Sequence, residues 1–220
     1  MTLKKYILSC IASILCLGVF AQNFEGKISA KMEAIEVPDD MKGMEGMMKQ
    51  EMTIYSKKEK NRTELKNMMS TTVIISDTVK KETIILVDMM GQKTAMKQTI
   101  ESGASTSAFG FEVEGGTFQT TSETKIIAGY KCFKGIYTFP SETESSVIIW
   151  YTNDITNPDF GSDVPGMIME YTMKMEGITM QFTVTAVTKQ TVPDSLFEIP
   201  AGYNIKTEEE FQNSIPTMGK

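Results

Sequence analysis

Apolar and polar residues alternate along most of the chain with a period of two, which is the pattern of a β-strand buried on one face. In the first such run, 24–34, apolar or small residues stand at every even position and charged or polar residues stand between them. Further runs are rich in threonine, isoleucine, valine and aromatic residues. They lie near 51–57, 61–66, 71–77, 83–88, 93–100, 117–127, 130–139, 146–152, 167–175 and 178–189. The pattern predicts about 10–11 antiparallel strands in a sheet that curls into a barrel or part of one.

Two interior segments break the alternation. Residues 38–52 carry methionines that would lie within an arc of about 80° on a helix, namely Met41, Met44, Met48 and Met52. This spacing predicts a short amphipathic helix or lid, although Gly43 and Gly46 weaken it by about 1 kcal/mol each. Residues 155–166 are rich in Asp, Asn, Gly and Pro and are predicted to be a loop.

The segment 167–186 predicts a hairpin whose two faces differ sharply. A two-residue turn at Glu176-Gly177 fixes the register, because Gly177 can adopt the positive φ that tight hairpins require. One face then pairs Met175 with Ile178, Met173 with Met180, Tyr171 with Phe182, Met169 with Val184 and Met167 with Ala186. The other face pairs Lys174 with Thr179, Thr172 with Gln181, Glu170 with Thr183 and Ile168 with Thr185. A slip by one residue would exchange the faces, so this register is strongly specified.

The apolar face of the hairpin needs a cover, since burying one such side chain contributes about 1.5–3 kcal/mol. The protein's own core is one candidate cover. A deformable cavity for an apolar ligand is another, because methionine adapts to many shapes and specifies a core poorly. The expected ligand-binding residues form a wall and a lid. They are Met167, Met169, Tyr171, Met173, Met175, Met180 and Phe182 in the wall and Met41, Met44 and Met48 in the lid.

The N-terminus has the organisation of a secretory signal peptide. Lys4 and Lys5 precede an apolar run over 6–20, and small residues occupy the positions before a cut after Ala21. The run is too short for a stable transmembrane anchor, which needs roughly 17–25 residues. We therefore expect a signal peptide over 1–21, a single β domain over 22–205 and a polar C-terminal tail over 206–220. Such a protein would be periplasmic or secreted.

The polar tail begins with a pair of residues that can cap a helix. Thr207 and Glu210 have the spacing of a capping box and could start one helical turn. A frayed tail is the alternative for the same segment.

Charge argues against nucleic-acid partners. Without the signal peptide the chain has 20 Lys and Arg against 28 Asp and Glu, a net charge of −8. Arg62 is the single arginine, whereas phosphate recognition favours basic patches and arginine forks. Cys132 would be the one remaining cysteine, so no internal disulfide is expected, and it is best interpreted as a small buried apolar residue.

The sequence offers no catalytic constellation. It contains no histidine, which removes the usual general base and zinc ligand. It also has no Gly-x-Ser-x-Gly motif and no phosphate-binding glycine-rich loop. Asp154 is interpreted as a turn residue and Lys131 as a solvated strand residue. We therefore predict neither enzymatic activity nor a cofactor.

Several pieces of the C-terminal half resemble a known family. They are T-K-I-I-A-G-Y-K-C over 124–132, V-I-I-W-Y-T-N-D-I over 147–155, P-G-M-I-M-E-Y over 165–171 and D-S-L-F-E-I-P-A-G-Y over 194–203. The chain is similar to the exported Bacteroidetes family called domain of unknown function 4412, related to the lipoprotein-carrier-like proteins typified by LolA. The resemblance implies a mainly β fold in which a strongly curved antiparallel sheet, a half-barrel, has one or two short helices or loops packed in its concave face. In such half-barrels the concave face holds acyl chains or similar ligands. It implies no catalytic residue.

These observations favour an exported binding protein for an apolar small molecule, a lipid or a lipidated protein. Two alternatives remain open. Thioethers are soft ligands, and M-K-G-M-E-G-M-M over 41–48 resembles methionine-only copper motifs, so a periplasmic copper(I)-binding protein is one. The other is a structural or interaction domain with a solid core.

Overall fold

The structure, a computed structural model, describes residues 24–99, 116–139, 146–155, 164–175 and 177–212. The strands are β1 Gly26–Glu36, β2 Gln50–Lys57, β3 Lys60–Lys66, β4 Ser70–Asp77, β5 Glu82–Met89, β6 Gln92–Thr99, β7 Thr117–Ile127, β8 Tyr130–Thr138, β9 Ser146–Thr152, β10 Met167–Met175, β11 Ile178–Lys189 and β12 Asn204–Lys206. Short helices are η1 Asp39–Met41, η2 Glu45–Met48, η3 Asp194–Phe197 and α2 Glu208–Gln212. The predicted signal peptide lies outside the described residues.

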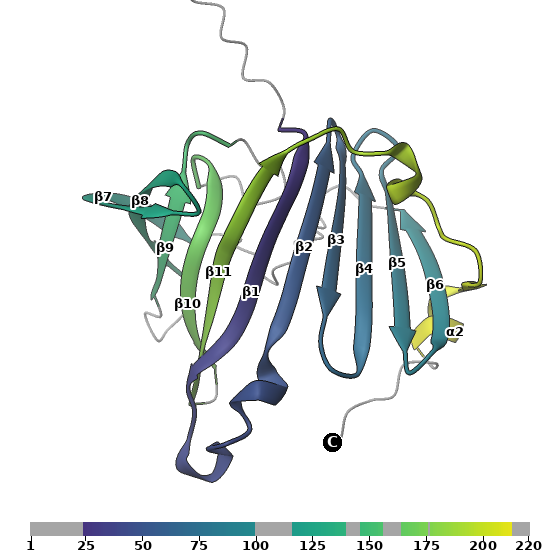
Figure 1. Ribbon diagram of the computed structural model, residues 1–220, viewed down its shortest axis with the longest axis horizontal. Coiled ribbons are helices and arrows are strands. Elements are labelled where there is room, and N and C mark those ends of the chain that lie inside the picture. The colour runs from purple at the N-terminus through teal and green to yellow at the C-terminus, as the bar shows by residue number, and fades with distance from the viewer. Residues whose placement is uncertain (1–23, 100–115, 140–145, 156–163, 176, 213–220) are drawn as a thin grey trace, which may run out of the picture.

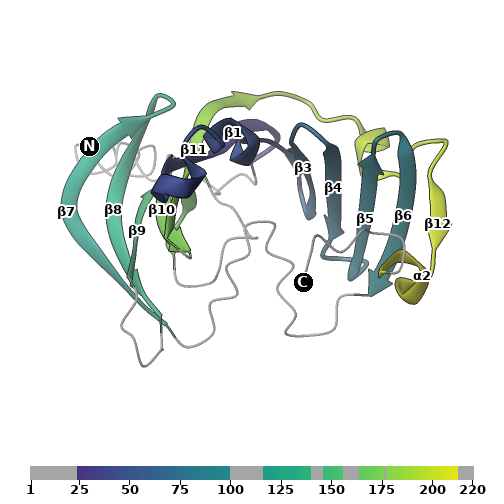
Figure 2. The ribbon, with the colours of Figure 1, turned by 90° about the horizontal axis from the view of Figure 1, so that it is seen from below.

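All these strands belong to one sheet, in the order β12-β6-β5-β4-β3-β2-β1-β11-β10-β9-β8-β7 (Figure 1). Seen from one end of the strands, the sheet bends into an arch (Figure 2). The predicted mainly β fold with one strongly curved sheet is confirmed. The three-residue β12 was not predicted, and it pairs in parallel with β6.

The inner and outer faces of the arch follow from the pairing register of the strands. Ile28, Ile54 and Phe182 lie on one face because Ile28 is opposite Ile54 in β2 and the same face continues into β11. Tyr55 is the next residue after Ile54 and therefore lies on the opposite face, in a row with Arg62 of β3. The chain after β11 covers this second face, and in Figure 2 that stretch passes over the outer side of the arch. The first face is thus the inner one.

The outer face carries a core of its own over β3–β6. Its buried members are Val73, Ile75, Ile84, Leu86 and Ala95 of the sheet, with Val192 and Phe197 of the covering stretch. The prediction placed covering elements on the concave face, and the structure adds this layer on the convex one.

Three polar anchors hold the covering stretch in place. Arg62 Nη1 donates a hydrogen bond of 2.8 Å to the Leu196 carbonyl, and Lys57 Nζ donates one of 2.9 Å to the Val192 carbonyl. The Val192 amide donates to Glu25 Oε1 at 2.9 Å. The single arginine of the chain, 8% exposed, therefore has a structural role on the outer face.

At the C-terminal side, the capping box expected at Thr207 forms. The Thr207 amide donates to Glu210 Oε2 at 3.0 Å, and the Glu210 amide donates to Thr207 Oγ1 at 3.3 Å. These reciprocal bonds satisfy backbone donors at the start of α2. Phe211 is buried, which gives the short helix an apolar attachment beside β6 and β12.

Candidate functional site

The methionine hairpin forms β10 and β11 with the predicted register from its turn down to Glu170. Met173 lies opposite Met180 and Tyr171 opposite Phe182, and the two rings stack with centroids 5.0 Å apart. Gly177 has the expected positive φ of +86°. The regular pairing of β10 with β11 extends from the turn to Glu170 and Thr183.

A β-bulge changes the pattern at the start of β10. Between Ile168 and Glu170 the register against β9 shifts by one residue, so that Met169 is the extra residue. The expected place of Ile168 on the polar face is therefore wrong. It pairs with Tyr151, and the three consecutive residues 167–169 are all buried.

The predicted wall divides into a sealed part and an accessible part. Met167, Met169, Tyr171 and Phe182 are each 0% exposed and belong to one buried core. Because the bulge moves Ile168 to the face of Tyr151, Met167, which pairs with Thr152, lies on the other face of β10, and its expected place in the wall is wrong. Met173 and Met180, nearer the turn, are half-buried. The backbone of Met175 pairs with that of Ile178. The side chain of Met175 is outside the part of the chain that the structure describes. Only the turn-proximal end of the hairpin can therefore contact a ligand without opening the core.

The predicted lid consists of two 3-10 turns instead of an α-helix. Gly43 adopts a φ of +90°, which no right-handed helix accommodates, so η1 and η2 stay separate. Met41 and Met48 are half-buried, and Met44 is 43% exposed. The segment lies at the turn end of the hairpin, where a Cβ added to Gly177 would be 3.4 Å from Pro38 Cγ.

Sequence reasoning missed an apolar row that crosses the inner face from β1 to β6. The pairing register aligns Ile28, Ile54, Thr63, Ile74, Ile85 and Met96 across the strands. In this row Ile74 and Ile85 are only half-buried, as is Val87 one position further along the inner face. The signal was present in the continuous apolar run 84–87, because a strand that is apolar on both faces needs two covers.

Next to the apolar row lies a polar one. The register aligns Ser56, Asn61, Ser76 and Thr83, and all four are less than 9% exposed. Thr83 is 0% exposed, and its hydroxyl has no hydrogen-bond partner in the described part of the chain. An unsatisfied buried hydroxyl costs about 1–3 kcal/mol. The inner face thus changes from polar to apolar along the strands.

Burial raises the pKa of two side chains in the core, Tyr171 and Cys132. Desolvation raises the pKa of Tyr171 well above 10.0, its ordinary value, because the charged form would lie in an apolar core. Burial likewise raises the pKa of the Cys132 thiol, which donates a hydrogen bond of 3.4 Å to the Tyr130 carbonyl. Cys132 is 0% exposed, which confirms its interpretation as a buried apolar residue.

The raised pKa of Tyr171 makes stability sensitive to alkali. The neutral Tyr171 side chain makes its full contribution to the free energy of unfolding below pH 10, where it is neutral in both the folded and the unfolded chain. Above pH 10 the side chain ionises first in the unfolded chain, so the free energy of unfolding falls as the pH rises. Phenylalanine cannot ionise, so in Tyr171→Phe the free energy of unfolding should fall less steeply above pH 10, by up to about 1.4 kcal/mol per pH unit. Urea unfolding of both proteins from pH 8 to pH 11 measures the difference. Parallel stability curves for the variant and the unchanged protein would contradict the assignment.

Neither a metal cluster nor a membrane-spanning helix is found in the described ranges. No group of three or more Cys, Asp and Glu side chains there is placed to hold a metal ion. No helix among the described residues is long and apolar enough to cross a membrane.

Comparison with solved structures finds several chains of low similarity. The chain of PNGF-II matches with 14% identity and a TM-score of 0.47, over 86% of this protein and 32% of that chain. This protein thus spans about a third of the PNGF-II chain. Lipoprotein LppX of Mycobacterium tuberculosis matches with 11% identity and a TM-score of 0.40, over 77% of this protein and 89% of LppX.

A third structure, an outer membrane lipoprotein-sorting protein domain from Vibrio parahaemolyticus, gives 9% identity and a TM-score of 0.32, over 79% and 89% of the two chains. These values are too low to assign a fold family or a function. Comparison with curated proteins finds no match.

The family assignment rests on the sequence. The family model described as Domain of unknown function (DUF4412) matches residues 39–162, which is more than half of the chain. This range runs from η1 to beyond β9 and so includes both strands of the half-buried apolar pair, β4 and β5. The predicted family is confirmed: the chain belongs to the DUF4412 family.

Proposed function

We propose that this protein binds an apolar, lipid-like ligand or a lipidated partner on the inner face of its arched sheet, without catalysis, in the periplasm or outside the cell. One observation carries the proposal. At their centres β4 and β5 carry apolar residues on both faces, and the chain itself buries the outer face under Val192 and Phe197. On the inner face Ile74 and Ile85 stay half-buried.

Burial on this face suits a carrier. The gain from covering apolar surface is non-directional and proportional to area, so it holds chains of varied shape and permits release. The half-buried thioethers of Met173 and Met180 extend the apolar surface at the hairpin. Methionine packs against irregular shapes more readily than leucine or isoleucine does.

The polar row does not contribute to the accessible surface. Its four members, Thr83 among them, are each less than 9% exposed, whereas Ile74 and Ile85 are half-buried. The ligand is therefore expected to make its contacts through its apolar part.

Native mass spectrometry of the full chain after gentle purification tests the proposal. We expect a bound mass in the range of a lipid, which is lost in Ile85→Glu because a charge on the apolar row has no partner there. Val79→Glu is the matched control, since Val79 is 74% exposed in the β4–β5 turn. This variant should retain the ligand. An unchanged protein that carries no apolar ligand, or an Ile85→Glu variant that retains it, would refute the proposal.

Copper(I) binding is the second candidate, favoured by the direct pairing of Met173 with Met180. Two thioethers on facing strands are soft donors of the kind that this ion prefers. The same native spectra separate the candidates, because a copper ion and a lipid add very different masses. In the double variant Met173→Leu/Met180→Leu, a bound copper ion would be lost because the thioethers are gone, whereas a bound lipid would be kept because leucine is equally apolar.

A further inference from the structure

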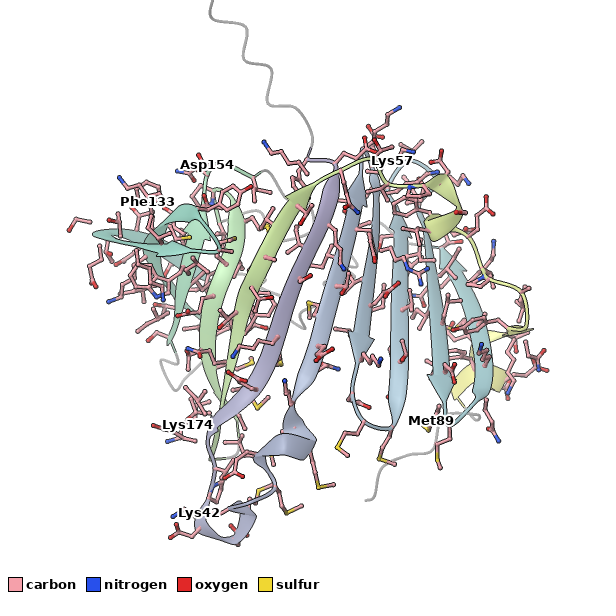
Figure 3. All side chains as sticks on the ribbon, viewed as in Figure 1. Lys42, Lys57, Met89, Phe133, Asp154 and Lys174 are labelled. Atoms are coloured by element: carbon pink, nitrogen blue, oxygen red, sulfur yellow. The ribbon has the colours of Figure 1, made fainter. Side chains whose placement is uncertain are left out.

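Exposed methionines gather at one rim of the sheet. Because the strands alternate in direction, the β1–β2, β3–β4 and β5–β6 connections all lie at the same end. We define the methionine rim as four side chains from these connections. They are Met47 at 64%, Met68 at 81%, Met69 at 58% and Met90 at 84% exposed. Figure 3 shows Met89, Lys42 and Lys174 at this end and Lys57 at the opposite one.

Local hydrogen bonds fix the turns that present these side chains. Asn67 Oδ1 accepts bonds from the amides of Met69 at 2.9 Å and Ser70 at 2.8 Å. In the next turn Asp88 Oδ1 accepts a bond of 3.1 Å from the amide of Gly91. Met90 adopts a φ of +52°, a conformation in which asparagine or glycine is the preferred residue. The turn therefore does not require a methionine at position 90.

The opposite rim has a different chemistry. Its β2–β3 turn reads Lys57-Lys58-Glu59-Lys60, and its β4–β5 turn contains Lys80 and Lys81. The exposed large apolar side chains at that end are Val79 and Ile126, among the described residues. The two ends of the same sheet thus differ in polarity.

Charged residues of both signs accompany the methionine rim. Lys49, Lys66 and Lys174 are exposed at this end, and in the described part of the chain they form no salt bridge. The carboxylates of Asp40 and Glu51 are exposed at the same end. Apolar tips among charges of both signs suit the interface of a bilayer with zwitterionic headgroups, where the tips are buried and the charges stay at headgroup level.

We propose that the methionine rim docks the protein on the surface of a phospholipid bilayer. The tips come from three separate connections at the same end of the sheet, so one extended surface can contact them together. The lysines and carboxylates beside them complement the phosphate and the amine of a zwitterionic headgroup. The rim uses none of the residues assigned above to the inner-face ligand, so docking stands independently of what the arch binds.

Vesicle co-sedimentation of the full chain tests the docking surface. The rim variant Met68→Ser/Met69→Ser/Met90→Asn removes three apolar tips, and asparagine suits the positive φ of the last position. The control Val79→Ser/Ile126→Ser removes two exposed apolar side chains from the opposite rim. All three proteins carry the same N-terminus, verified by mass, so that differences among them report the rim.

We expect the unchanged protein and the control to bind phosphatidylcholine vesicles, and the rim variant to bind roughly tenfold or more weakly. Phosphatidylglycerol should not strengthen binding, because the exposed carboxylates at the same end offset the lysines. Binding to neutral vesicles should persist at about 0.5 M salt, where charges are screened within a few ångströms. Equal binding by the rim variant, equal loss in the control, or no binding of the unchanged protein to either vesicle would overturn the proposal.

Discussion

Replacing Phe182 by alanine is expected to lower the free energy of unfolding by about 3–5 kcal/mol. Phe182 is 0% exposed at the centre of the inner-face core, and its ring stacks on Tyr171 with centroids 5.0 Å apart. The substitution removes this contact and leaves a cavity between β10 and β1, whose Met32 lies opposite Phe182. Equilibrium urea unfolding followed by circular dichroism measures the loss.

The matched control is Ile148→Ala in β9. Ile148 is 45% exposed, so its truncation is expected to change stability by about 0.5 kcal/mol or less. A similar loss in both variants would mean that the hairpin is not the centre of the core. A loss below about 1 kcal/mol for Phe182→Ala would mean that the site collapses or is already open to solvent.

A single added methyl group at Gly26 is expected to lower stability by about 3 kcal/mol. A Cβ there would lie 2.2 Å from the Thr188 carbonyl oxygen of β11, and this obstacle is backbone. The clash separates β1 from β11 at the middle of the sheet, where the two halves of the arch join. Thermal unfolding of Gly26→Ala measures the effect.

Gly46→Ala supplies the comparison. No atom lies within 4 Å of a Cβ placed on Gly46, so alanine should be accepted within about 0.5 kcal/mol. If both alanines were tolerated equally, the close approach of β1 and β11 at Gly26 would be refuted.

The hairpin shows how far local sequence can reach. The period of two fixed which residues share a face, and Gly177 fixed where the chain reverses, so the pairing of Met173 with Met180 could be predicted. The bulge at Met169 could not, because it arises where β10 pairs with β9, a strand brought beside it by the fold. The same reason explains why β12 was missed: three residues carry no period, and their partner is β6.

The candidate site was predicted only in part. Methionine content drew attention to the hairpin, yet Met167 and Met169 proved to be sealed within the core. The apolar run 84–87 indicated that β5 is buried on both faces, but not which cover each face would receive. The stretch around Val192 and Phe197 covers the outer face, and this leaves Ile85 half-buried on the inner one.

The sequence by itself determined the strands, their turns and the apolar side of each, because these depend on residues within a few positions of one another. Only the tertiary structure decided the order of the strands in the sheet, the second core on its outer face and the common end at which Met47, Met68 and Met90 emerge. Those features depend on contacts between residues far apart in the chain. Alternation along one strand carries no information about which segment will lie across it.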